Sequence, residues 1–339
     1  MSGRVYGVDL GTSSIKIYKK GKGIVCNEKN IIAIENRKKV IAIGDSAYEM
    51  YEKSPENVDV SFPVRKGVIA DIAHMEALFN GFIRKINKGG KAASARYVVA
   101  IPTDITEVEK KAFIDLIESS VAKVKDVVVV DKPIAAALGA ELDITNARGV
   151  MMVDIGAATT EIAILSLGGI VISKLLPIGG ETFDEAIATS IKKKCNLFIG
   201  NKTAGALKEE LGCAYPTADG EKYIYGRNVV TGLPQEINIK SPLIYEAIKE
   251  SLNAIVDAIK MILERTPPEI SSDIIDSGIY ISGGSALIRQ FAELISEQTE
   301  LQANICFNPA SAVVKGLGRI IEEPALSQLA VDPRKTVRR

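Results

Sequence analysis

Two short segments combine an aspartate, a glycine and small hydroxyl residues at the end of an apolar strand pattern, and this combination suits phosphate binding. The first is VDLGTSSIKI at 8–17, and the second is VDIGAATTEI at 153–162. In a turn with glycine at its tip, backbone N–H groups point at one small volume, and no Cβ obstructs an approaching anion. Two such turns facing each other across a cleft would hold the phosphates of a nucleotide.

The side chains of the two turns add to this chemistry. Hydroxyl groups donate hydrogen bonds, and a lysine offers a positive point charge to phosphate. The residues that we expect to contact phosphate are Gly11, Thr12, Ser13, Ser14 and Lys16 in the first turn, and Gly156, Ala157, Ala158 and Thr159 in the second.

Asp9 and Asp154 precede the two turns, and contact between a carboxylate and a phosphate would be repulsive. We therefore expect both to face a hydrated Mg²⁺, because magnesium usually keeps several waters and is held by one or two carboxylates together with phosphates. The alternative is that both aspartates only cap their turns.

A third glycine stretch, ISGGSALI at 281–288, follows the last strand pattern and opens a helix. Its backbone suits close approach by an adenine ring or a ribose, where only glycine leaves room. The residues that we expect beside the adenosine are Gly283, Gly284, Ser285, Ala286 and Leu287. Such a turn is weak evidence for nucleotide binding by itself, and it becomes stronger evidence in combination with the two phosphate turns.

The two aspartates stand 145 positions apart (154 − 9), and the GIV at 23–25 is echoed at 169–171. Two Asp-x-Gly turns, each followed by the same second strand, favour an internal duplication. Two unrelated hairpins are the alternative, since glycine and aspartate are ordinary turn residues.

The apolar spacing around these turns predicts an α/β protein, with helices on both faces of a mixed sheet and the same scheme in each half. Thr106 and Glu109 form a capping-box pattern, and Pro133 suits the first turn of a helix. The helices that we expect lie at 73–88, 106–123, 133–142, 181–195 and 203–212, with smaller subdomains inserted at about 30–72 and about 181–250.

The amino-acid composition argues against several classes of function. The 339 residues suffice for two domains with real cores, and 42 basic residues balance 42 acidic ones, which argues against nucleic acid as a partner. The single histidine, His74, excludes His-based zinc sites and Ser-His-Asp triads. The sequence shows no signal peptide, no apolar run long enough to span a membrane and no cysteine spacing typical of metal ligands. We therefore expect a cytosolic protein with buried thiols at Cys26, Cys195, Cys213 and Cys306.

The chain resembles the superfamily of actin, the large heat-shock chaperone ATPases and the sugar kinases, and nearly end to end it is similar to the MreB family of bacterial actins. The segments that carry this resemblance are DLGT (9–12), KGKGIVCNE (20–28), PVRKGVIAD (63–71), IPTDITEVE (101–109), KPIAAALGAEL (132–142), VDIGAATTEIAILSLGGIV (153–171), GGETFDEAI (179–187), NLFIGNKTA (196–204), GRNVVTGLPQEI (226–237) and GIYISGGSALI (278–288).

The resemblance implies a duplicated actin-like (ribonuclease H-like) fold with ATP in the cleft between two lobes. Lobe I would comprise 1–142 plus about 316–339, and lobe II would comprise 143–315. It also implies filaments of paired protofilaments that serve cell shape, cell deformation or motility. By the same resemblance, the residues near the ribose are Gly205, Ala206, Leu207 and Lys208, although the family usually has acidic residues at the first two positions.

One departure from the family concerns hydrolysis. The family normally has Glu-Glu-Pro where this chain has Asp131, Lys132 and Pro133, and the second glutamate orients the attacking water. A protonated lysine has three donors and no acceptor, so Lys132 cannot take over that role. The family's GGGTT also becomes GAATT, although Thr159 remains as a catalytic candidate. We therefore expect ATP to bind and to be hydrolysed slowly.

A second departure concerns the membrane. The family often uses an amphipathic amino-terminal helix or an apolar loop, and neither MSGRVY nor NKGGKAASAR supplies one. The basic tail at 333–339 could contact anionic lipid at roughly 1 kcal/mol per charge. A solvated, disordered terminus is the alternative, so membrane association stays open.

Three functions remain open at this stage. The first is a nucleotide-dependent filament of identical subunits. The second is a chaperone- or kinase-type ATPase that acts as a soluble monomer, although the chain ends without a peptide-binding domain and Lys132 is a poor base. The third is a regulatory paralogue that turns over little ATP and co-assembles with an active relative.

Overall fold

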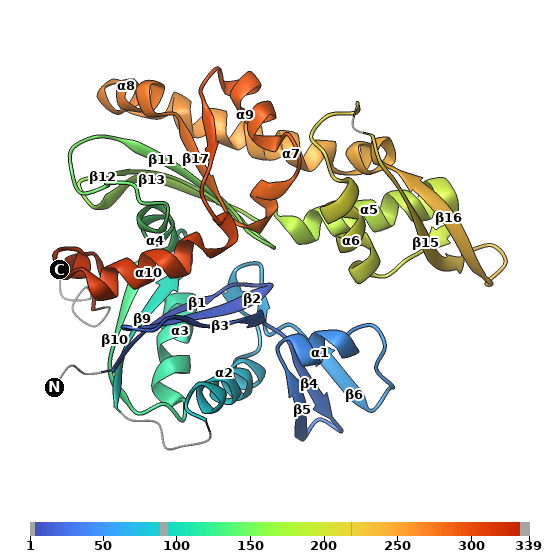
Figure 1. The fold of residues 1–339 in the computed structure, drawn as a ribbon, viewed down its shortest axis with the longest axis horizontal. Helices are drawn as coiled ribbons and strands as arrows, with labels where there is room; N and C mark the ends of the chain where they lie inside the picture. Colours follow the sequence, from blue (N-terminus) through green and yellow to red (C-terminus); the bar gives the residue numbers. More distant parts are fainter. Residues whose placement is uncertain (1–3, 89–93, 218, 333–339) are drawn as a thin grey trace.

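The computed structural model describes residues 4–88, 94–217 and 219–332, and it contains two five-stranded sheets of the same design (Figure 1). In strand order, the first sheet consists of β3 (Gly23–Lys29), β2 (Ser14–Lys19), β1 (Arg4–Leu10), β9 (Ala95–Ile101) and β10 (Val124–Asp131). The second consists of β13 (Gly169–Leu176), β12 (Thr160–Ser166), β11 (Val150–Ile155), β17 (Ile279–Ser282) and β18 (Ala303–Ile305).

Each sheet joins an antiparallel meander to a parallel pair. In the first sheet β2 pairs antiparallel with both β1 and β3, and β9 pairs parallel with both β1 and β10. In the second sheet the same relations hold for β12 and β17. The repeated topology confirms the duplication and the mixed α/β sheets that the sequence predicts.

The helices form three layers around the two sheets (Figure 1). One face of the first sheet is covered by α2 (Ile72–Ile86) and α3 (Glu107–Ser119). Between the sheets lie α4 (Lys132–Gly139) and α10 (Ala312–Glu322). On the outer face of the second sheet pack α7 (Ser241–Glu264), α8 (Pro268–Ser277) and α9 (Phe291–Thr299), and α5 (Gly180–Cys195) continues this core beside α6 (Asn201–Leu211) and α7. Short 3₁₀ turns are η1 (Gly284–Leu287), η2 (Pro309–Ser311) and η3 (Pro324–Leu329).

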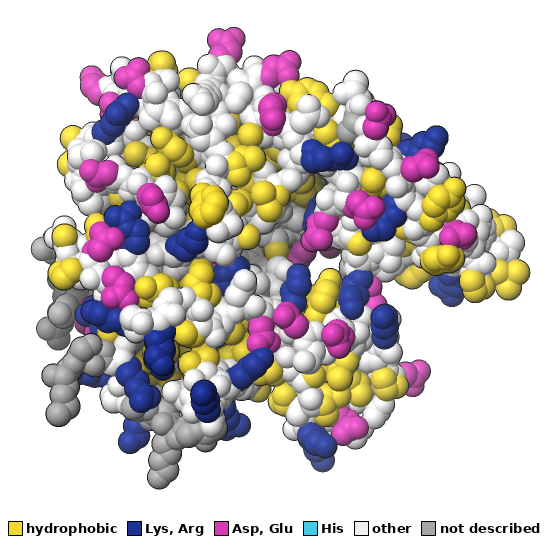
Figure 2. Space-filling model, viewed as in Figure 1, with side chains coloured by type: hydrophobic (Ala, Val, Ile, Leu, Met, Phe, Trp, Pro, Cys, Tyr) yellow, Lys and Arg dark blue, Asp and Glu magenta, His cyan; other side chains and the backbone are white. Residues whose placement is uncertain are grey.

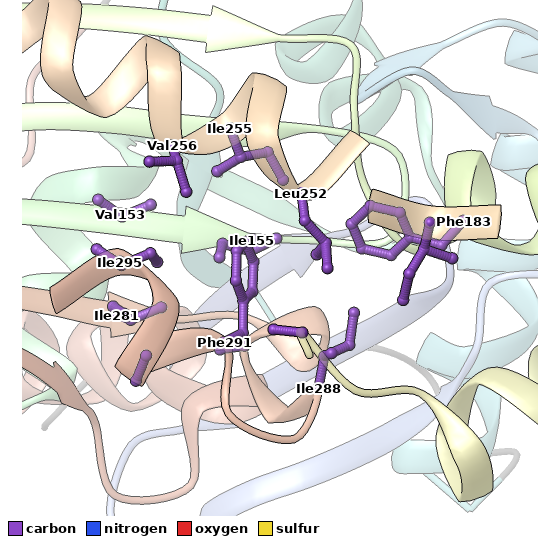
Figure 3. Packing of buried hydrophobic residues seen from close by; sticks show 14 of the residues in the cluster. Val153, Ile155, Phe183, Leu252, Ile255, Val256, Ile281, Ile288, Phe291 and Ile295 are labelled. Atoms are coloured by element: carbon purple, nitrogen blue, oxygen red, sulfur yellow. The ribbon is translucent and has the colours of Figure 1, made fainter. Parts of the chain in front are cut away.

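Both faces of the strands are apolar because both faces are covered. In β9 the side chains of Tyr97 and Val99 pack toward α2 and α3, whereas Val98 and Ala100 pack toward α4 and α10. This follows from the two-residue period of a strand. Figure 3 shows the corresponding outer core of the second sheet, where Val153 and Ile155 of β11 meet side chains of α7 and α9.

The helices α4 and α10 cross with their backbones almost in contact. A Cβ at Gly139 would lie 1.8 Å from the carbonyl oxygen of Ala312, and a Cβ at Gly316 would lie 1.7 Å from that of Ala135. Any larger side chain at either glycine would separate the helices. Because this pair touches both sheets, it fixes how the two halves meet.

Two smaller parts extend from the sheets toward the same side of the molecule (Figure 1). The first holds the sheet β5-β4-β6, with β4 (Ile32–Glu35), β5 (Lys39–Ile43), β6 (Val58–Ser61), the helix α1 (Asp45–Met50) and the hairpin of β7 (Val64–Arg65) and β8 (Val68–Ile69). The second holds α6 (Asn201–Leu211) and the sheet of β14 (Leu197–Phe198), β15 (Glu221–Asn228) and β16 (Pro234–Lys240).

Several local predictions can be compared directly with the structure. The capping box is present, since Thr106 accepts from the N–H of Glu109 and the Glu109 carboxylate accepts from the N–H of Thr106. Pro133 lies in the first turn of α4. The expectation for the cysteines was wrong in one case, because Cys195 at the end of α5 is only partly buried. Among the described residues, no helix has the length and apolar character needed to cross a membrane.

Candidate functional site

Each of the two predicted phosphate turns is closed by the same backbone hydrogen bond. The N–H of Gly11 donates to the carbonyl of Ser14 at 3.0 Å, and the N–H of Gly156 donates to the carbonyl of Thr159 at 2.8 Å. The first turn joins β1 to β2 and the second joins β11 to β12. The two halves of the chain therefore present matching turns.

The β7–β8 hairpin brings the two turns together. At its tip the N–H of Gly67 donates to the Thr12 hydroxyl at 3.3 Å. A Cβ at Gly67 would lie 3.3 Å from the methyl group of Thr159, so the same glycine touches the second turn. With a φ of 81°, Gly67 has a backbone conformation that suits glycine. The predicted phosphate residues Thr12 and Thr159 thus both lie beside Gly67.

Buried charges lie behind these turns. Lys132 Nζ is 3.8 Å from Asp9 Oδ1, and both side chains are about one-tenth exposed. Lys16, which is opposite Asp9 in the β1–β2 ladder, donates from Nζ to the Ser14 hydroxyl at 2.6 Å. Asp154 Oδ1 accepts a hydrogen bond of 2.6 Å from the Ser282 hydroxyl. Burial raises the pKa of Asp154, while that hydrogen bond and the nearby Lys132 oppose the rise.

Glu161 belongs to the same buried group and is not among the site residues predicted from the sequence. It stands opposite Asp154 in the β11–β12 ladder. Its Oε2 accepts from the N–H of Thr103 at 3.1 Å and from the Thr103 hydroxyl at 3.2 Å. Burial raises the pKa of Glu161 to about 8. A glutamate in the apolar strand TEIAILS was the available signal, because a charged side chain is rarely buried without a partner or a role.

The partners of the Asp9 and Asp154 carboxylates limit how these residues could hold a magnesium ion. Among the described residues, no three His, Cys, Asp or Glu side chains form a cluster suited to a metal. One Asp9 oxygen faces an ammonium, and one Asp154 oxygen accepts from a hydroxyl. These residues fit an ion that is held mainly by phosphates and waters, as is usual for Mg²⁺.

Lys132 is the first residue of α4 and points toward Asp9, whereas Asp131, the last residue of β10, points elsewhere. Asp131 lines a separate cavity together with Thr103 and Lys110. Burial raises its pKa, and Lys110 opposes the rise. The two neighbouring side chains thus face different parts of the molecule, so Asp131 does not stand in for Lys132.

The glycine stretch after β17 packs against the second turn. The Ser285 hydroxyl donates to the carbonyl of Gly156 at 2.9 Å. Gly283 has a φ of 87°, and a Cβ there would lie 2.1 Å from the carbonyl oxygen of Ile155, so this position requires glycine. Ala286 is buried, while Leu287 is exposed and Gly284 has open space beside it.

The segment 205–208 approaches the same region through one side chain. Lys208 Nζ donates to the carbonyl of Gly180 at 2.8 Å and pairs with Asp184 at 2.7 Å. A Cβ at Gly180 would lie close to both Lys208 Nζ and the Ser285 hydroxyl, so the two predicted adenosine segments meet there. Gly205 lies beside Asp184, Ala206 is exposed, and the side chain of Leu207 is fully buried in the core.

Comparisons with known proteins match almost the whole chain. A family model described as MreB/Mbl protein matches residues 3–328. The cell shape-determining protein Mbl of Bacillus subtilis (strain 168) is 40% identical over 324 residues, which cover 95% of this chain and 97% of that protein. The cell shape-determining protein MreB of Escherichia coli (strain K12) is 37% identical over 322 residues, which cover 93% of this chain and 92% of that protein.

Two solved structures are similar over almost their whole length. The crystal structure of MreB5 of Spiroplasma citri bound to ADP has a TM-score of 0.90 and 31% identity, and the match covers 97% of this chain and 98% of that one. The MamK double helical filament has a TM-score of 0.77 and 23% identity, and the match covers 94% of this chain and 99% of that one. At this lower identity the likeness to MamK shows the fold alone.

Proposed function

Because this chain belongs to the MreB/Mbl family and has its actin-like fold, we propose that it is an ATP-binding cytoskeletal protein that polymerises into filaments. The filaments would act in cell shape, cell deformation or motility. The observation that supports ATP binding most directly is the meeting of two matching glycine turns at Gly67. Backbone donors of both turns would hold the phosphates, and the η1 turn and Lys208 would lie beside the adenosine.

The proposal includes Mg²⁺ as a companion of ATP. Asp154 would accept hydrogen bonds from water molecules bound to the ion. Asp9 would do the same through the carboxylate oxygen that does not face Lys132. Bound in this way, magnesium would neutralise part of the phosphate charge. Thr159 would contact the terminal phosphate through its backbone and hydroxyl. Hydrolysis would be slow, because Lys132 has no acceptor with which to orient a water.

The division into lobes is part of the same proposal. Lobe I would comprise 1–142 with the carboxyl-terminal segment, and lobe II would comprise 143–315. The expected start of the returning segment near 316 falls inside α10, which begins at Ala312. Since α10 and α4 cross at Gly139 and Gly316, this crossing would be the pivot between the lobes.

Exposed apolar side chains at the two ends of the molecule support end-to-end polymerisation. Figure 2 shows hydrophobic side chains gathered at the tip of the arm that carries β15 and β16. The exposed members of this apolar tip are Tyr223, Tyr225, Val229, Val230 and Leu233. At the other end, Leu167 in the β12–β13 turn is 71% exposed, and the next residue, Gly168, packs on Leu329 near the carboxyl end (Figure 1).

An apolar patch of this kind marks an interaction site, and a contact between different surfaces of identical subunits generates an open filament when the rotation between subunits does not close a ring. We propose that the apolar tip of one copy contacts the Leu167 end of the next. Two such protofilaments would pair, and related paralogues would be able to join them. Under this proposal the protein is cytoplasmic. The basic tail at 333–339, which we expect to make any membrane contact, lies outside the described residues.

Sedimentation and electron microscopy in the presence of ATP test the filament. The wild type should pellet. The double change Val230→Glu and Leu233→Glu should raise the critical concentration for polymerisation roughly tenfold or more, because it replaces two apolar contact residues with carboxylates that the interface would have to bury. Val108→Glu is the matched control, since Val108 is 79% exposed on α3, away from both ends. Failure of the wild type to pellet with ATP would overturn the filament, and normal pelleting of the double variant would overturn the apolar tip as its contact.

A further inference from the structure

Lys132 occupies an unusual position for a lysine. Its Nζ and the Asp9 carboxylate are 3.8 Å apart, and their side chains are 10% and 9% exposed. A lysine is rarely buried unless its charge is matched, because leaving water is costly for an ammonium. At 3.8 Å the pair is held by charge attraction without a short hydrogen bond, so the ammonium retains donors for another acceptor.

Lys132 lies among several titratable side chains. Asp9 and Glu161 are buried acids, Asp154 is a half-buried acid, and Lys16 and Lys132 are the buried amines among them. Lys132 lowers the pKa of both Asp154 and Glu161 as well as facing Asp9, so it lies centrally among the three acids. Lys16 is bound to the Ser14 hydroxyl at the first turn. Both amines therefore stand directly behind the turns that would hold phosphate.

A triphosphate entering this space brings several negative charges close to Asp9 and Asp154, beside a Glu161 whose pKa is raised to about 8 by burial. Positive charge has to be supplied there, and a divalent ion is one source. A fixed ammonium is another, since lysine is a compact point charge suited to phosphate. The structure supplies that charge from α4, whose first residue is held in place by the packing of the helix between the two sheets.

We infer that Lys132 is a cationic phosphate ligand that replaces much of the magnesium requirement of this site, so that ATP binds with little dependence on divalent metal. This inference rests on the proposed function, because it concerns the same nucleotide. Lys132 would exchange part of its attraction to Asp9 for a phosphate oxygen. A purely structural role, in which the ammonium only neutralises Asp9, predicts instead that removing the metal weakens ATP binding.

The test compares ATP dissociation constants in Mg²⁺ and in excess EDTA, by isothermal titration of the full chain. For the wild type, removing the metal should weaken binding by less than about threefold. For Lys132→Gln, which lacks the positive charge, removing the metal should weaken ATP binding by about tenfold or more. Lys132→Arg, which keeps the charge, and Lys110→Gln, which changes a lysine facing Asp131, should behave like the wild type. Circular dichroism establishes that each variant is folded.

The outcomes separate the two proposals. A wild-type protein that binds ATP in Mg²⁺ and loses about tenfold or more affinity in EDTA overturns this inference and leaves the proposed function standing. The wild-type measurement decides this point even if Lys132→Gln does not fold. Metal-free binding by Lys132→Gln with wild-type affinity also overturns the role of Lys132. A folded wild type that binds no ATP in either condition overturns both proposals.

Discussion

The Glu52 carboxylate accepts a hydrogen bond of 2.6 Å from the backbone N–H of Asn201, although 149 residues separate the two in sequence. It also accepts one of 3.2 Å from the N–H of Lys202. These donors belong to the first turn of α6, where a negative charge is favourable and no side chain of the helix's own N-cap provides one. Lys202 completes the contact by donating from Nζ to the carbonyl of Tyr48 at 2.6 Å.

This contact joins the part of the molecule that carries α1 to the part that carries α6, on opposite sides of the proposed cleft (Figure 1). We predict that Glu52→Ala accelerates release of bound ATP. Since Glu52 is exposed, the loss should be about 0.5–1 kcal/mol, or roughly two- to fivefold in the release rate. Stopped-flow displacement of a fluorescent ATP analogue measures this rate.

Glu49→Ala is the matched control for that experiment. Glu49 is also exposed and lies in α1, but it is not among the side chains that bind α6. Its replacement should leave the release rate unchanged. Equal release rates for wild type and Glu52→Ala would show that the contact does not hold the cleft closed.

Hydrolysis should respond to the charge at position 132. We predict that Lys132→Glu raises phosphate release in the presence of Mg²⁺ by at least about tenfold, because a carboxylate accepts hydrogen bonds from water and positioned acid–base groups contribute roughly 10²–10⁴-fold. The same variant should bind ATP only with the metal, since it adds an acid beside Asp9, Asp154 and Glu161.

A phosphate-release assay under single-turnover conditions measures the change. Asp131→Asn is the control, because Asp131 faces Lys110 on another side of the same connection. Fast hydrolysis by the wild type, or a slower rate in Lys132→Glu than in the wild type, would contradict the assignment of Lys132 as the cause of low turnover.

The crossing of α4 and α10 should tolerate no added volume. We predict that Gly316→Ala destabilises the protein by about 1–3 kcal/mol, because its Cβ would overlap the Ala135 carbonyl oxygen at 1.7 Å and the helices must move apart. Denaturant titration followed by circular dichroism measures the effect.

Gly169→Ala serves as its control, since the nearest atom to a Cβ there is 3.8 Å away. That change should stay within about 0.5 kcal/mol of the wild type. Equal midpoints for the two variants would mean that the helix crossing is not as tight as the structure shows.

The duplicated fold could be predicted because its signals are local. Asp9-x-Gly11 and Asp154-x-Gly156 mark turns, and the apolar strands around them follow from periodicity alone. The observed turns and sheets repeat as expected. The proposed lobe boundary near 316 falls inside α10, which begins at Ala312, because the sequence pattern alone does not show where the chain passes from one lobe to the other.

The parts of the site that could not be predicted depend on contacts between distant segments. Gly67 joins Thr12 to Thr159 only because the β7–β8 hairpin reaches between the turns. Glu161 is recognisable as a special residue only once Thr103 is seen beside it. The sequence shows that Lys132 lacks an acceptor, but its pairing with Asp9 appears only in three dimensions.

Titration calorimetry of ATP into the purified, folded wild-type chain in Mg²⁺ tests the central claim most directly. The account predicts saturable binding of one ATP per chain, held between the turns at Gly11 and Gly156. A folded protein that gives no saturable signal with ATP would contradict it.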